Sequence, residues 1–408
     1  MKDLYSQNHL YRNNFNIPKI GNSDVIYFCG HSLGLKQKNS SSQINAELEA
    51  WEKLAVEAHH RSENPWVSFH ENLISQSASI VGAKDNEVVV MNSLTVNLHL
   101  LLVSFYKPSK EKYKIIIEKN AFPSDIYALK SQIRFHGFDP DESIIEIESN
   151  DNSYYISEED IISCLQSNAD QSCLLLMGGV NYLSGQAFNM RKITKLCSNL
   201  GIIAGFDLAH AAGNIELKLN EWKVDFACWC GYKYLNGGPG CPSGVFINEK
   251  YFKQKVNRFE GWWGTDKLSR FKMEPDFMPI KSAEAWQISN PPIFSMAPLW
   301  SSLNMFHQVG MKRLRRYGLE LSDYLYGSLK DIDSKSIKII SPESKYERGC
   351  QISLVVKNYN NLREELLNNH IICDFREPNI LRIAPVPMYN TIEDINFFIS
   401  VLKKIIKK

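Results

Sequence analysis

The sequence lacks a long apolar run, an excess of one charge and any paired-cysteine motif. No stretch approaches the roughly 18 apolar residues of a membrane span, and the N-terminal string MKDLYSQNHLYRNN has no apolar core, so we expect neither a membrane anchor nor an export signal. Lysine and arginine number 46 against 45 aspartates and glutamates, so the net charge of +1 creates no field to attract nucleic acid or a membrane surface. The expected partner is a small molecule.

The nine cysteines form an odd set without a C-x-x-C pair, and most of them lie in apolar runs. This pattern favours reduced, buried thiols in the cytoplasm over disulfides or a metal centre. The sequence also lacks a G-x-G-x-x-G string at its first strand turn, and it has no G-x-x-x-x-G-K string. It therefore predicts no site for NAD or ATP.

The composition is that of an ordinary globular protein, with 44% hydrophobic and 22% charged residues in a chain of 408. A chain of this length predicts two or three domains. We expect an N-terminal segment (1–50), a large α/β domain (51–294) and, after Pro291 and Pro292, a small α+β domain (295–408).

Short β-rich runs recur from residue 87 onward, and the first five start about thirty residues apart, which leaves room for one helix and its turns between strands. A mainly parallel, seven-stranded sheet with flanking helices is therefore predicted. The runs are 87–91, 114–117, 143–148, 173–177, 202–207, 225–230 and 244–248.

Helix signals fill the gaps between these runs. Pro123 and Ser124 precede the string IYALKSQI, Ser157 and Asp160 form a capping-box variant, and Gly201 follows RKITKLCSNL. Helices are therefore expected to alternate with the strands.

A further helix is predicted ahead of the first strand, leading into the large domain. Ser42 is placed to cap it. One apolar face is expected, formed by Ile44, Leu48, Trp51 and Ala55.

Strand ends carry the chemistry in an open α/β sheet, because ligands bind beyond the carboxyl ends of the strands. The first run is followed by Leu94 and Thr95, the fifth ends at Asp207, and the sixth leads into Lys233. The first end supplies a helix N-terminus that suits a phosphate, the second supplies a carboxylate, and the third supplies an amine. Each is common alone, so the prediction depends on the three together.

Pyridoxal phosphate needs these three groups, because it forms a Schiff base with a lysine, requires a protonated pyridine nitrogen and carries a phosphate. Lys233, Asp207 and Thr95 match these needs in turn. Gly237 and Gly238 let the chain turn sharply after the lysine. We therefore predict a pyridoxal-phosphate site.

Longer strings carry a resemblance to a known family. The chain resembles kynureninases, which are fold type I pyridoxal-phosphate enzymes, over about residues 28 to 392. The resemblance implies a homodimer with shared active sites that hydrolyses L-kynurenine or 3-hydroxy-L-kynurenine to an anthranilate and L-alanine. The matching strings are FPSD (122–125), FDLAHAAGN (206–214), DFACWCGYKYLNGGPG (225–240), FEGWWG (259–264), ISNPPI (288–293) and LRIAPVPMYN (381–390).

The resemblance assigns a cofactor site residue by residue. It gives Lys233 the Schiff base, Asp207 the pyridine nitrogen, and Tyr232 the phosphate and a proton relay. Trp262 and Asn290 are expected to complete the site from the neighbouring subunit. The other residues that it places against the cofactor are Leu94, Thr95, Phe122, Pro123, Ser124, Asp125 and His210.

The resemblance also places four residues at the substrate. Arg382 matches the position that holds the substrate α-carboxylate, a task that suits a planar guanidinium fork. Ser32, His59 and Asn290 match positions at the aromatic end. A histidine together with the pair Ser289 and Asn290 favours 3-hydroxykynurenine as the substrate.

Two positions depart from the family pattern. Gly178 stands where family members commonly have serine or threonine, which removes a hydroxyl near the cofactor, and Asn181 or Tyr182 is the expected replacement. His31 stands where asparagine is expected, which alters the substrate end of the site.

Three alternatives remain open. The string GHSLG (30–34) fits the G-x-S-x-G elbow of serine hydrolases with Ser32 as nucleophile, although no helix-forming string follows it. A sibling enzyme of the same fold, such as a cysteine desulfurase or an aminotransferase, shares Lys233 and Asp207, and Cys350 is its one tempting persulfide carrier. The third is a non-catalytic pyridoxal-phosphate protein. A role in NAD synthesis or in tryptophan breakdown does not follow from the sequence.

Overall fold

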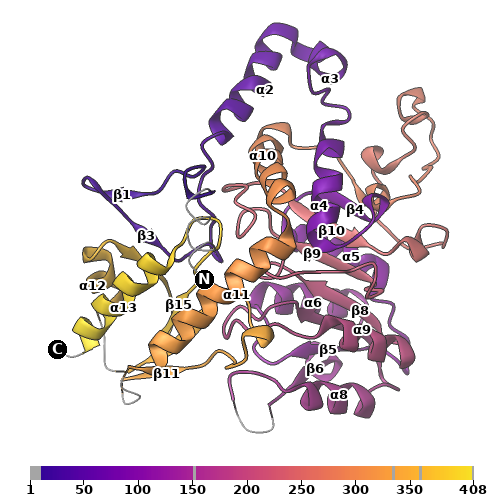
Figure 1. The fold of residues 1–408 in the computed structure, drawn as a ribbon. Coiled ribbons are helices and arrows are strands. Elements are labelled where there is room, and N and C mark those ends of the chain that lie inside the picture. Colours follow the sequence, from indigo (N-terminus) through magenta and orange to yellow (C-terminus); the bar gives the residue numbers. More distant parts are fainter. Residues whose placement is uncertain (1–10, 150–152, 333–335, 358–360, 407–408) are drawn as a thin grey trace.

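The computed structural model describes residues 11–149, 153–332, 336–357 and 361–406. The first ten residues of the expected N-terminal segment therefore lie outside the described part of the chain. The described residues form a large α/β unit and a smaller α+β unit beside it (Figure 1).

The large unit is built on the predicted seven-stranded sheet, in the order β4-β10-β9-β8-β7-β5-β6. Strand β10 runs antiparallel to both of its neighbours, and the other pairs are parallel, so the mainly parallel sheet is confirmed. Each strand end lies within one residue of its predicted place. The strands are β4 (Val88–Met91), β5 (Lys114–Glu118), β6 (Ile144–Ile147), β7 (Ser172–Gly178), β8 (Ile203–Asp207), β9 (Phe226–Trp229) and β10 (Ser243–Ile247).

Successive residues of these strands face two different cores. In β4, Val88 and Val90 belong to the core on one face of the sheet, while Val89 and Met91 belong to the core on the other. Helices α5 and α6 cover the second face, and α4, α8, α9 and α10 contribute to the first. The helices are α4 (Ile74–Val81), α5 (Leu94–Phe105), α6 (Pro123–Phe135), α7 (Pro140–Ser143), α8 (Glu158–Ser167), α9 (Met190–Asn199) and α10 (Ile293–Val309).

The predicted helix signals between the strands are confirmed. Pro123 is the first residue of α6, where its missing N–H has no helical partner to lose. Ser157 and Asp160 form a reciprocal capping box at the start of α8. Gly201 follows α9 with a φ of 66°, a left-handed conformation that glycine adopts freely.

The prediction for Ser42 was wrong. Helix α2 (Ser40–Leu54) begins two residues earlier, after Asn39, because the Ser42 hydroxyl donates back to the Asn39 carbonyl instead of accepting a cap hydrogen bond. Its predicted apolar face is largely open, with Leu48 43% and Trp51 57% exposed. Figure 1 shows α2 and the short α3 (Ala58–Arg61) projecting from the body of the molecule.

The small unit contains a four-stranded antiparallel sheet in the order β11-β12-β15-β14 with a core of its own. The N-terminal segment is tied to it, because β3 (Ile26–Tyr27) pairs in parallel with β13 (Ile371–Ile372) and Phe28 lies in the small core. A two-stranded hairpin, β1 (Lys19–Ile20) and β2 (Ser23–Asp24), precedes β3. The remaining elements are α11 (Met311–Lys330), β11 (Ile337–Ile339), β12 (Ile352–Val356), α12 (Leu362–Asn368), β14 (Asp374–Arg376), β15 (Ile380–Ile383) and α13 (Ile392–Ile406).

The boundary between the two units stays a prediction. Met311 and Leu314 of α11 lie in the core of the large unit, whereas Leu321 and Leu325 of the same helix lie in the core of the small unit. One long helix, α11, thus contributes residues to both cores.

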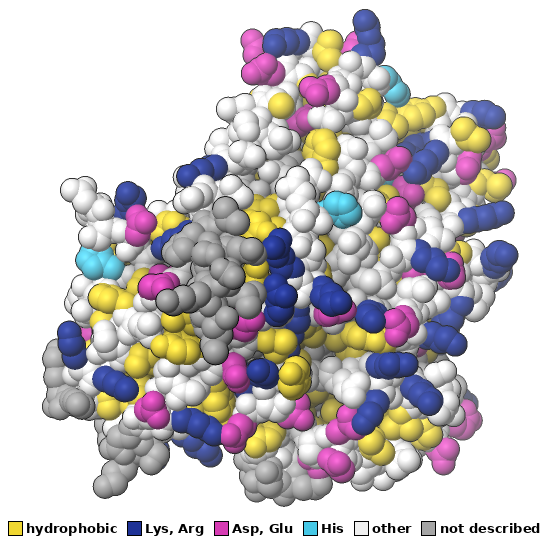
Figure 2. All heavy atoms as spheres, in the orientation of Figure 1, with side chains coloured by type: hydrophobic (Ala, Val, Ile, Leu, Met, Phe, Trp, Pro, Cys, Tyr) yellow, Lys and Arg dark blue, Asp and Glu magenta, His cyan; other side chains and the backbone are white. Residues whose placement is uncertain are grey.

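None of the described helices combines the length and the apolarity that crossing a bilayer demands. Figure 2 shows basic and acidic side chains interspersed over most of the face in view, which fits the balanced charge of the sequence.

Candidate active site

A cavity lies at the carboxyl ends of three neighbouring strands, where the predicted residues meet. Glu118 is the last residue of β5, Gly178 the last of β7, and Asp207 the last of β8. The cavity is lined by Glu118, Phe122, Asp125, Gly178, Val180, Tyr182, Asp207, Ala209, His210 and Lys233. The structure therefore brings five of the predicted site residues to one place, at the edge of the sheet where open α/β folds bind ligands.

Lys233 reaches this cavity from the loop after β9. Its Nζ lies 3.2 Å from His210 Nε2 and 5.8 Å from the centre of the Phe122 ring. The loop turns as predicted, because Gly238 has a φ of 84° and a Cβ on Gly237 would lie only 2.7 Å from a cysteine sulfur. Only glycine fits this turn, which fixes the direction from which the lysine enters.

Two predicted carboxyl groups share the cavity with this amine. Asp207 is 8% exposed, and its Oδ1 accepts a hydrogen bond from the Ala209 N–H at 2.6 Å. Burial raises the pKa of Asp207, while the nearby Lys233 acts in the opposite direction. Asp125 lies in the first turn of α6, and burial together with the neighbouring Asp207 raises its pKa well above the usual range.

The predicted phosphate end lies where two helices begin. Leu94 is the first residue of α5, and the Thr95 hydroxyl lies 2.8 Å from the Ser124 hydroxyl in the first turn of α6. Asn97 donates to the last carbonyl of β4 and accepts from Asn92, which holds the turn before α5 in place. The N-termini of α5 and α6 thus converge, and their free amides suit a dianion.

Arg382 is buried, at 1% exposed, rather than free at the end of its strand. Its guanidinium donates to Asp374 at 2.8 and 3.0 Å and to the Tyr182 carbonyl at 2.7 Å. Its charge also contributes, after burial and Lys233, to lowering the pKa of His210. The guanidinium is therefore fixed in orientation on the His210 side of the cavity.

The two departures from the family pattern have different outcomes. Asn181 does not replace the missing hydroxyl, because its Oδ1 accepts hydrogen bonds within its own loop from the N–H groups of Leu183 and Ser184. Tyr182 does line the cavity. His31 is fully buried with its ring 6.1 Å from that of His210, and neither of its nitrogens has a partner among the described residues.

Ten predicted residues are absent from the described lining of this cavity: Ser32, His59, Leu94, Thr95, Pro123, Ser124, Tyr232, Trp262, Asn290 and Arg382. Trp262 is 45% exposed and donates from its Nε1 to the Arg270 carbonyl, and Asn290 is exposed. The ring of His59 packs on Trp66. Its Nδ1 lies 3.0 Å from the Val56 carbonyl, in the turn just before α3.

Sequence reasoning missed Glu118. This side chain is 4% exposed, and the Gly178 N–H donates to both of its oxygens, at 3.0 and 3.1 Å. Burial raises the pKa of Glu118 to about 7. The signal was present, because Glu118 directly follows a predicted strand, as the residues chosen for the other strand ends do.

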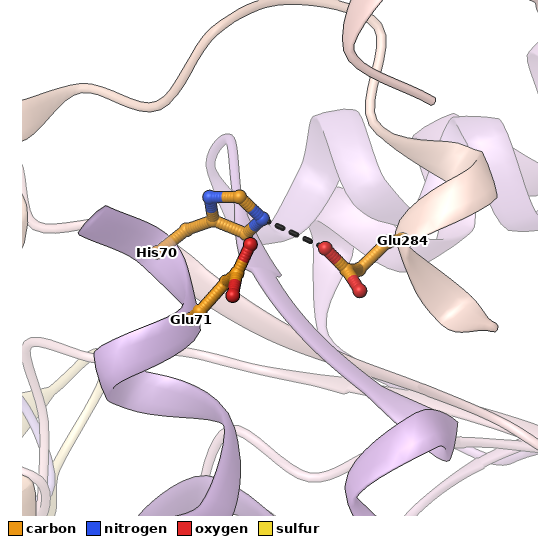
Figure 3. Close-up of side chains that lie close together, drawn as sticks. All are labelled: His70, Glu71 and Glu284. Carbon is orange, nitrogen blue, oxygen red and sulfur yellow. Dashed lines mark hydrogen bonds and ion pairs between the residues drawn. The ribbon is translucent and has the colours of Figure 1, made fainter. Parts of the chain in front are cut away.

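A second group of titratable side chains lies away from this cavity (Figure 3). His70 Nε2 lies 2.8 Å from a Glu284 oxygen, with Glu71 alongside. Lys267 pairs with both carboxylates, at 2.9 Å from each, so one ammonium group already offsets part of their negative charge. The group joins the start of the large unit to the segment between Trp262 and Asn290.

The structure weighs against two of the alternatives. Ser32 lies in a turn, and the next helix begins only at Ser40, so the strand-to-helix geometry of a nucleophile elbow is not formed. Cys350 is fully buried, and burial raises the pKa of its thiol to about 12, which leaves it unreactive.

Comparison with known proteins decides between the remaining readings. A kynureninase from Christiangramia forsetii is 48% identical to this chain over 399 residues, which cover 97% of this chain and 94% of the relative. The chain belongs to the kynureninase family. A kynureninase from Nematostella vectensis is 43% identical over 95% of this chain and 86% of its own length, and the family model for the kynureninase C-terminal domain matches residues 314–402. The predicted family is therefore confirmed over nearly the whole chain.

Solved structures with a similar fold come from more distant enzymes. A cysteine desulfurase from Thermococcus onnurineus NA1 is 18% identical with a TM-score of 0.77, over 94% of this chain and 95% of that one. The cystine C-S lyase C-DES is 15% identical with a TM-score of 0.81, over 95% and 99%. At these identities the likeness concerns the fold alone, and it confirms the predicted fold type I architecture for this chain.

Proposed function

We propose that this chain hydrolyses L-kynurenine or 3-hydroxy-L-kynurenine to an anthranilate and L-alanine, with pyridoxal phosphate as its cofactor. The observation that carries the proposal is that Lys233 and Asp207 share one cavity at the strand ends of a kynureninase-family chain.

The residues present fit this cofactor. Asp125 Oδ1 and His210 Nδ1 are buried in the cavity without a hydrogen-bond partner among the described residues. Both atoms are therefore available to bind a polar ligand. Lys233 Nζ would hold the aldehyde, Asp207 the ring nitrogen, and Thr95 with Ser124 the phosphate. When bound, pyridoxal phosphate supplies an electron sink for negative charge that develops on the substrate.

Protons are moved by Lys233 and oriented by its neighbours. Lys233 Nζ takes the α-proton of the substrate, and His210 Nε2 at 3.2 Å holds the amine in place. Burial and the charge of Lys233 lower the pKa of His210 well below its usual range, so its ring stays neutral and is free to accept a hydrogen bond. Burial raises the pKa of Tyr232, which keeps its phenol protonated as a donor for the phosphate.

The fixed guanidinium of Arg382 is proposed to bind the substrate α-carboxylate, and Ser32, His59 and Asn290 the aromatic end. Because a histidine and a serine-asparagine pair are present, 3-hydroxykynurenine is the proposed preferred substrate. Paired assays should give 3-hydroxykynurenine the higher kcat/KM. His59→Phe should reduce the ratio of the two kcat/KM values, whereas His60→Phe, at the exposed neighbouring position, should leave that ratio unchanged. A strong preference of the unaltered enzyme for kynurenine would contradict this assignment.

A homodimer with shared sites is proposed because the segment that carries Trp262 exposes an unusual number of large apolar side chains. Such a surface is typical of a protein interface. They are Phe259, Trp262, Leu268, Phe271, Met273 and Met278. A cytoplasmic location is proposed as well, supported by the free state of all nine cysteines.

Incubating the cofactor-loaded protein with each substrate tests the function directly. We expect equal amounts of L-alanine and the matching anthranilate, and Lys233→Ala should abolish both. Lys253→Ala, at an exposed lysine, is the control that should keep full activity. Sulfide release from cysteine, or no product from either kynurenine, would refute the proposed reaction.

A further inference from the structure

Three buried carboxyl groups open into the cavity that holds Lys233. Asp207 ends β8, Asp125 lies in the first turn of α6, and Glu118 ends β5. Their exposed fractions are 8%, 7% and 4% respectively. The family resemblance gives a role to the two aspartates, and none to Glu118.

Gly178 explains how Glu118 reaches the cavity. It ends β7, the strand that lies between β5 and β8, and its N–H holds both oxygens of Glu118. A Cβ at this position would lie 3.0 Å from Glu118 Oε1, so a side chain there would crowd the carboxyl group and require it to shift by a few tenths of an ångström. Gly178, which departs from the family pattern, therefore both leaves room for the Glu118 carboxyl group and binds it.

The charges in the cavity do not balance if all three carboxyl groups ionise. Lys233 is the one cationic group of the described lining, because His210 is held neutral. A buried charge without a partner is costly, and neighbouring carboxylates disfavour one another's ionisation. The three carboxyl groups are therefore not all ionised together near neutral pH. The titratable groups that line the cavity with Glu118 are Asp125, Tyr182, Asp207, His210 and Lys233.

Asp207 is the group best placed to be the anion. It accepts the short hydrogen bond from the Ala209 N–H, and Lys233 opposes the effect of burial on its pKa. Burial and the carboxylate of Asp207 raise the pKa of Asp125 well above the usual range. Burial and, to a smaller extent, Asp207 raise the pKa of Glu118 to about 7, against backbone hydrogen bonds from Gly178 and from Glu118 itself, which lower it.

We propose that Glu118 is a positioning residue of the cofactor site, seated by the bare backbone of Gly178, whose carboxyl group holds a proton so that Asp207 remains the anion facing Lys233. This inference rests on the proposed function for its meaning, because Asp207 is the proposed partner of the cofactor ring nitrogen. The protonation of Glu118 itself is a property of the cofactor-free protein and is testable without any reaction.

The first experiment uses the cofactor-free protein and the variant Glu118→Gln, which keeps the shape and still accepts from Gly178 but cannot ionise. A carboxyl group whose pKa is raised on folding stabilises the protein while it is protonated, and that stability is lost as pH rises toward the folded pKa. The melting temperature of the unaltered protein should therefore fall relative to Glu118→Gln between pH 4.5 and about 7, so that the variant melts higher at pH 8. Glu146→Gln, at an exposed glutamate on β6, should show no such divergence.

Infrared spectra of the same proteins give a direct readout. At pH 6 the carbonyl stretch of protonated carboxylic acids should contain a component that fades as pH passes about 7, and Glu118→Gln should lack this component while keeping the band of the protonated Asp125. If the variant and the unaltered protein have the same band and the same melting profile, Glu118 is ionised throughout and the inference is wrong. Neither measurement depends on turnover, so an inactive protein would refute the proposed function without touching this result.

The second experiment uses the cofactor-loaded enzyme and its visible absorption. Above its pKa, Glu118 adds a negative charge beside the cofactor, which favours nearby protonated groups. The pH midpoint of the absorption change should therefore move to lower pH in Glu118→Gln and stay in place in Glu146→Gln. An unmoved midpoint in both variants would show that Glu118 does not act on the cofactor.

The role of Gly178 is tested by adding only a methyl group. Gly178→Ala should displace the Glu118 carboxyl group and weaken cofactor binding, measured by titrating the cofactor-free protein with pyridoxal phosphate. The double variant with Glu118→Asp has an acidic side chain that is one methylene shorter, and it should regain part of the affinity for pyridoxal phosphate. Equal affinity of Gly178→Ala and the unaltered protein for pyridoxal phosphate would contradict the proposed role of Gly178 in positioning Glu118.

Discussion

At the scale of single residues, the site depends on side chains whose orientation is fixed by a second partner. Lys233 is held by His210, and Arg382 by Asp374 together with the Tyr182 carbonyl. A flexible lysine or arginine loses rotamer freedom when it binds a ligand, and these contacts impose part of that loss during folding. The substrate then meets groups that are already in place.

Replacing Arg382 with lysine tests the proposed grip on the substrate carboxylate. Lysine cannot offer the planar, two-pronged contact of a guanidinium, so we expect KM to rise roughly tenfold to a hundredfold with a smaller change in kcat. Steady-state kinetics with both kynurenines measure this split.

Arg376→Lys is the matched control, because Arg376 also pairs with Asp374, at 3.1 Å, but is exposed. It should change KM little. A similar rise of KM in both variants would show that Arg382 acts only by holding Asp374.

At the scale of elements, the short helices η2 (Phe69–Leu73) and η7 (Ala283–Trp286) are joined by the ion pairs around Glu284. Burial by itself raises the pKa of Glu284, but hydrogen bonds from His70 and Lys267 outweigh burial and hold the pKa at about 2. The contact therefore stabilises the place where the Trp262 segment returns to the body of the molecule.

Acid titration of unfolding tests this contact. Because the pKa is lowered on folding, the stabilisation is complete above the unfolded value near 4.5 and is lost as pH falls toward about 2. Glu284→Gln should lower the free energy of unfolding at pH 6 by up to about 3 kcal/mol, and the difference should shrink below pH 4.5.

Urea unfolding at a series of pH values measures the difference. Glu274→Gln, at an exposed position of the same segment, is the control and should unfold like the unaltered protein. A Glu284→Gln deficit that stays constant down to pH 2 would mean that the lost stability does not come from this ionisation.

At the scale of the whole molecule, the proposed site is divided between two copies of the chain. The cavity at the strand ends collects Lys233, Asp207 and Phe122, while Trp262 and Asn290 are exposed elsewhere on the described surface. The proposed homodimer accounts for this separation, because a second copy would bring the two sets together.

Mixing two inactive variants tests this division. Lys233→Ala and Asn290→Ala should each abolish or strongly reduce activity alone, and co-refolding them should restore roughly a quarter of the wild-type activity, because half of the mixed dimer's sites carry neither change. Activity of the mixture that never exceeds that of the separate variants would place both residues in a site formed by one chain.

The sequence predicted the positions of some residues correctly and missed those of others. Asp207 and Lys233 were identified because Asp207 ends its strand and Lys233 lies in the loop that follows its strand, and local sequence decides where a strand ends. Glu118 obeys the same rule, yet its importance arises from Gly178, which lies 60 residues away along the chain. Ser42 was misassigned because a hydroxyl in a first turn is able to donate as well as accept, and local sequence does not choose between the two.

The sequence alone determined the seven strands, the helices between them and the family, because these depend on short-range periodicity and on strings of adjacent residues. Tertiary structure decided that β5 lies between β7 and β6, with β4 at the opposite edge of the sheet, and so placed the Glu118 carboxyl group against Gly178 and near Asp207. It also decided that α2 packs against α10 with Trp51 still largely exposed. Strand order and the packing of a helix depend on contacts between distant segments, and no local pattern encodes which distant segment arrives.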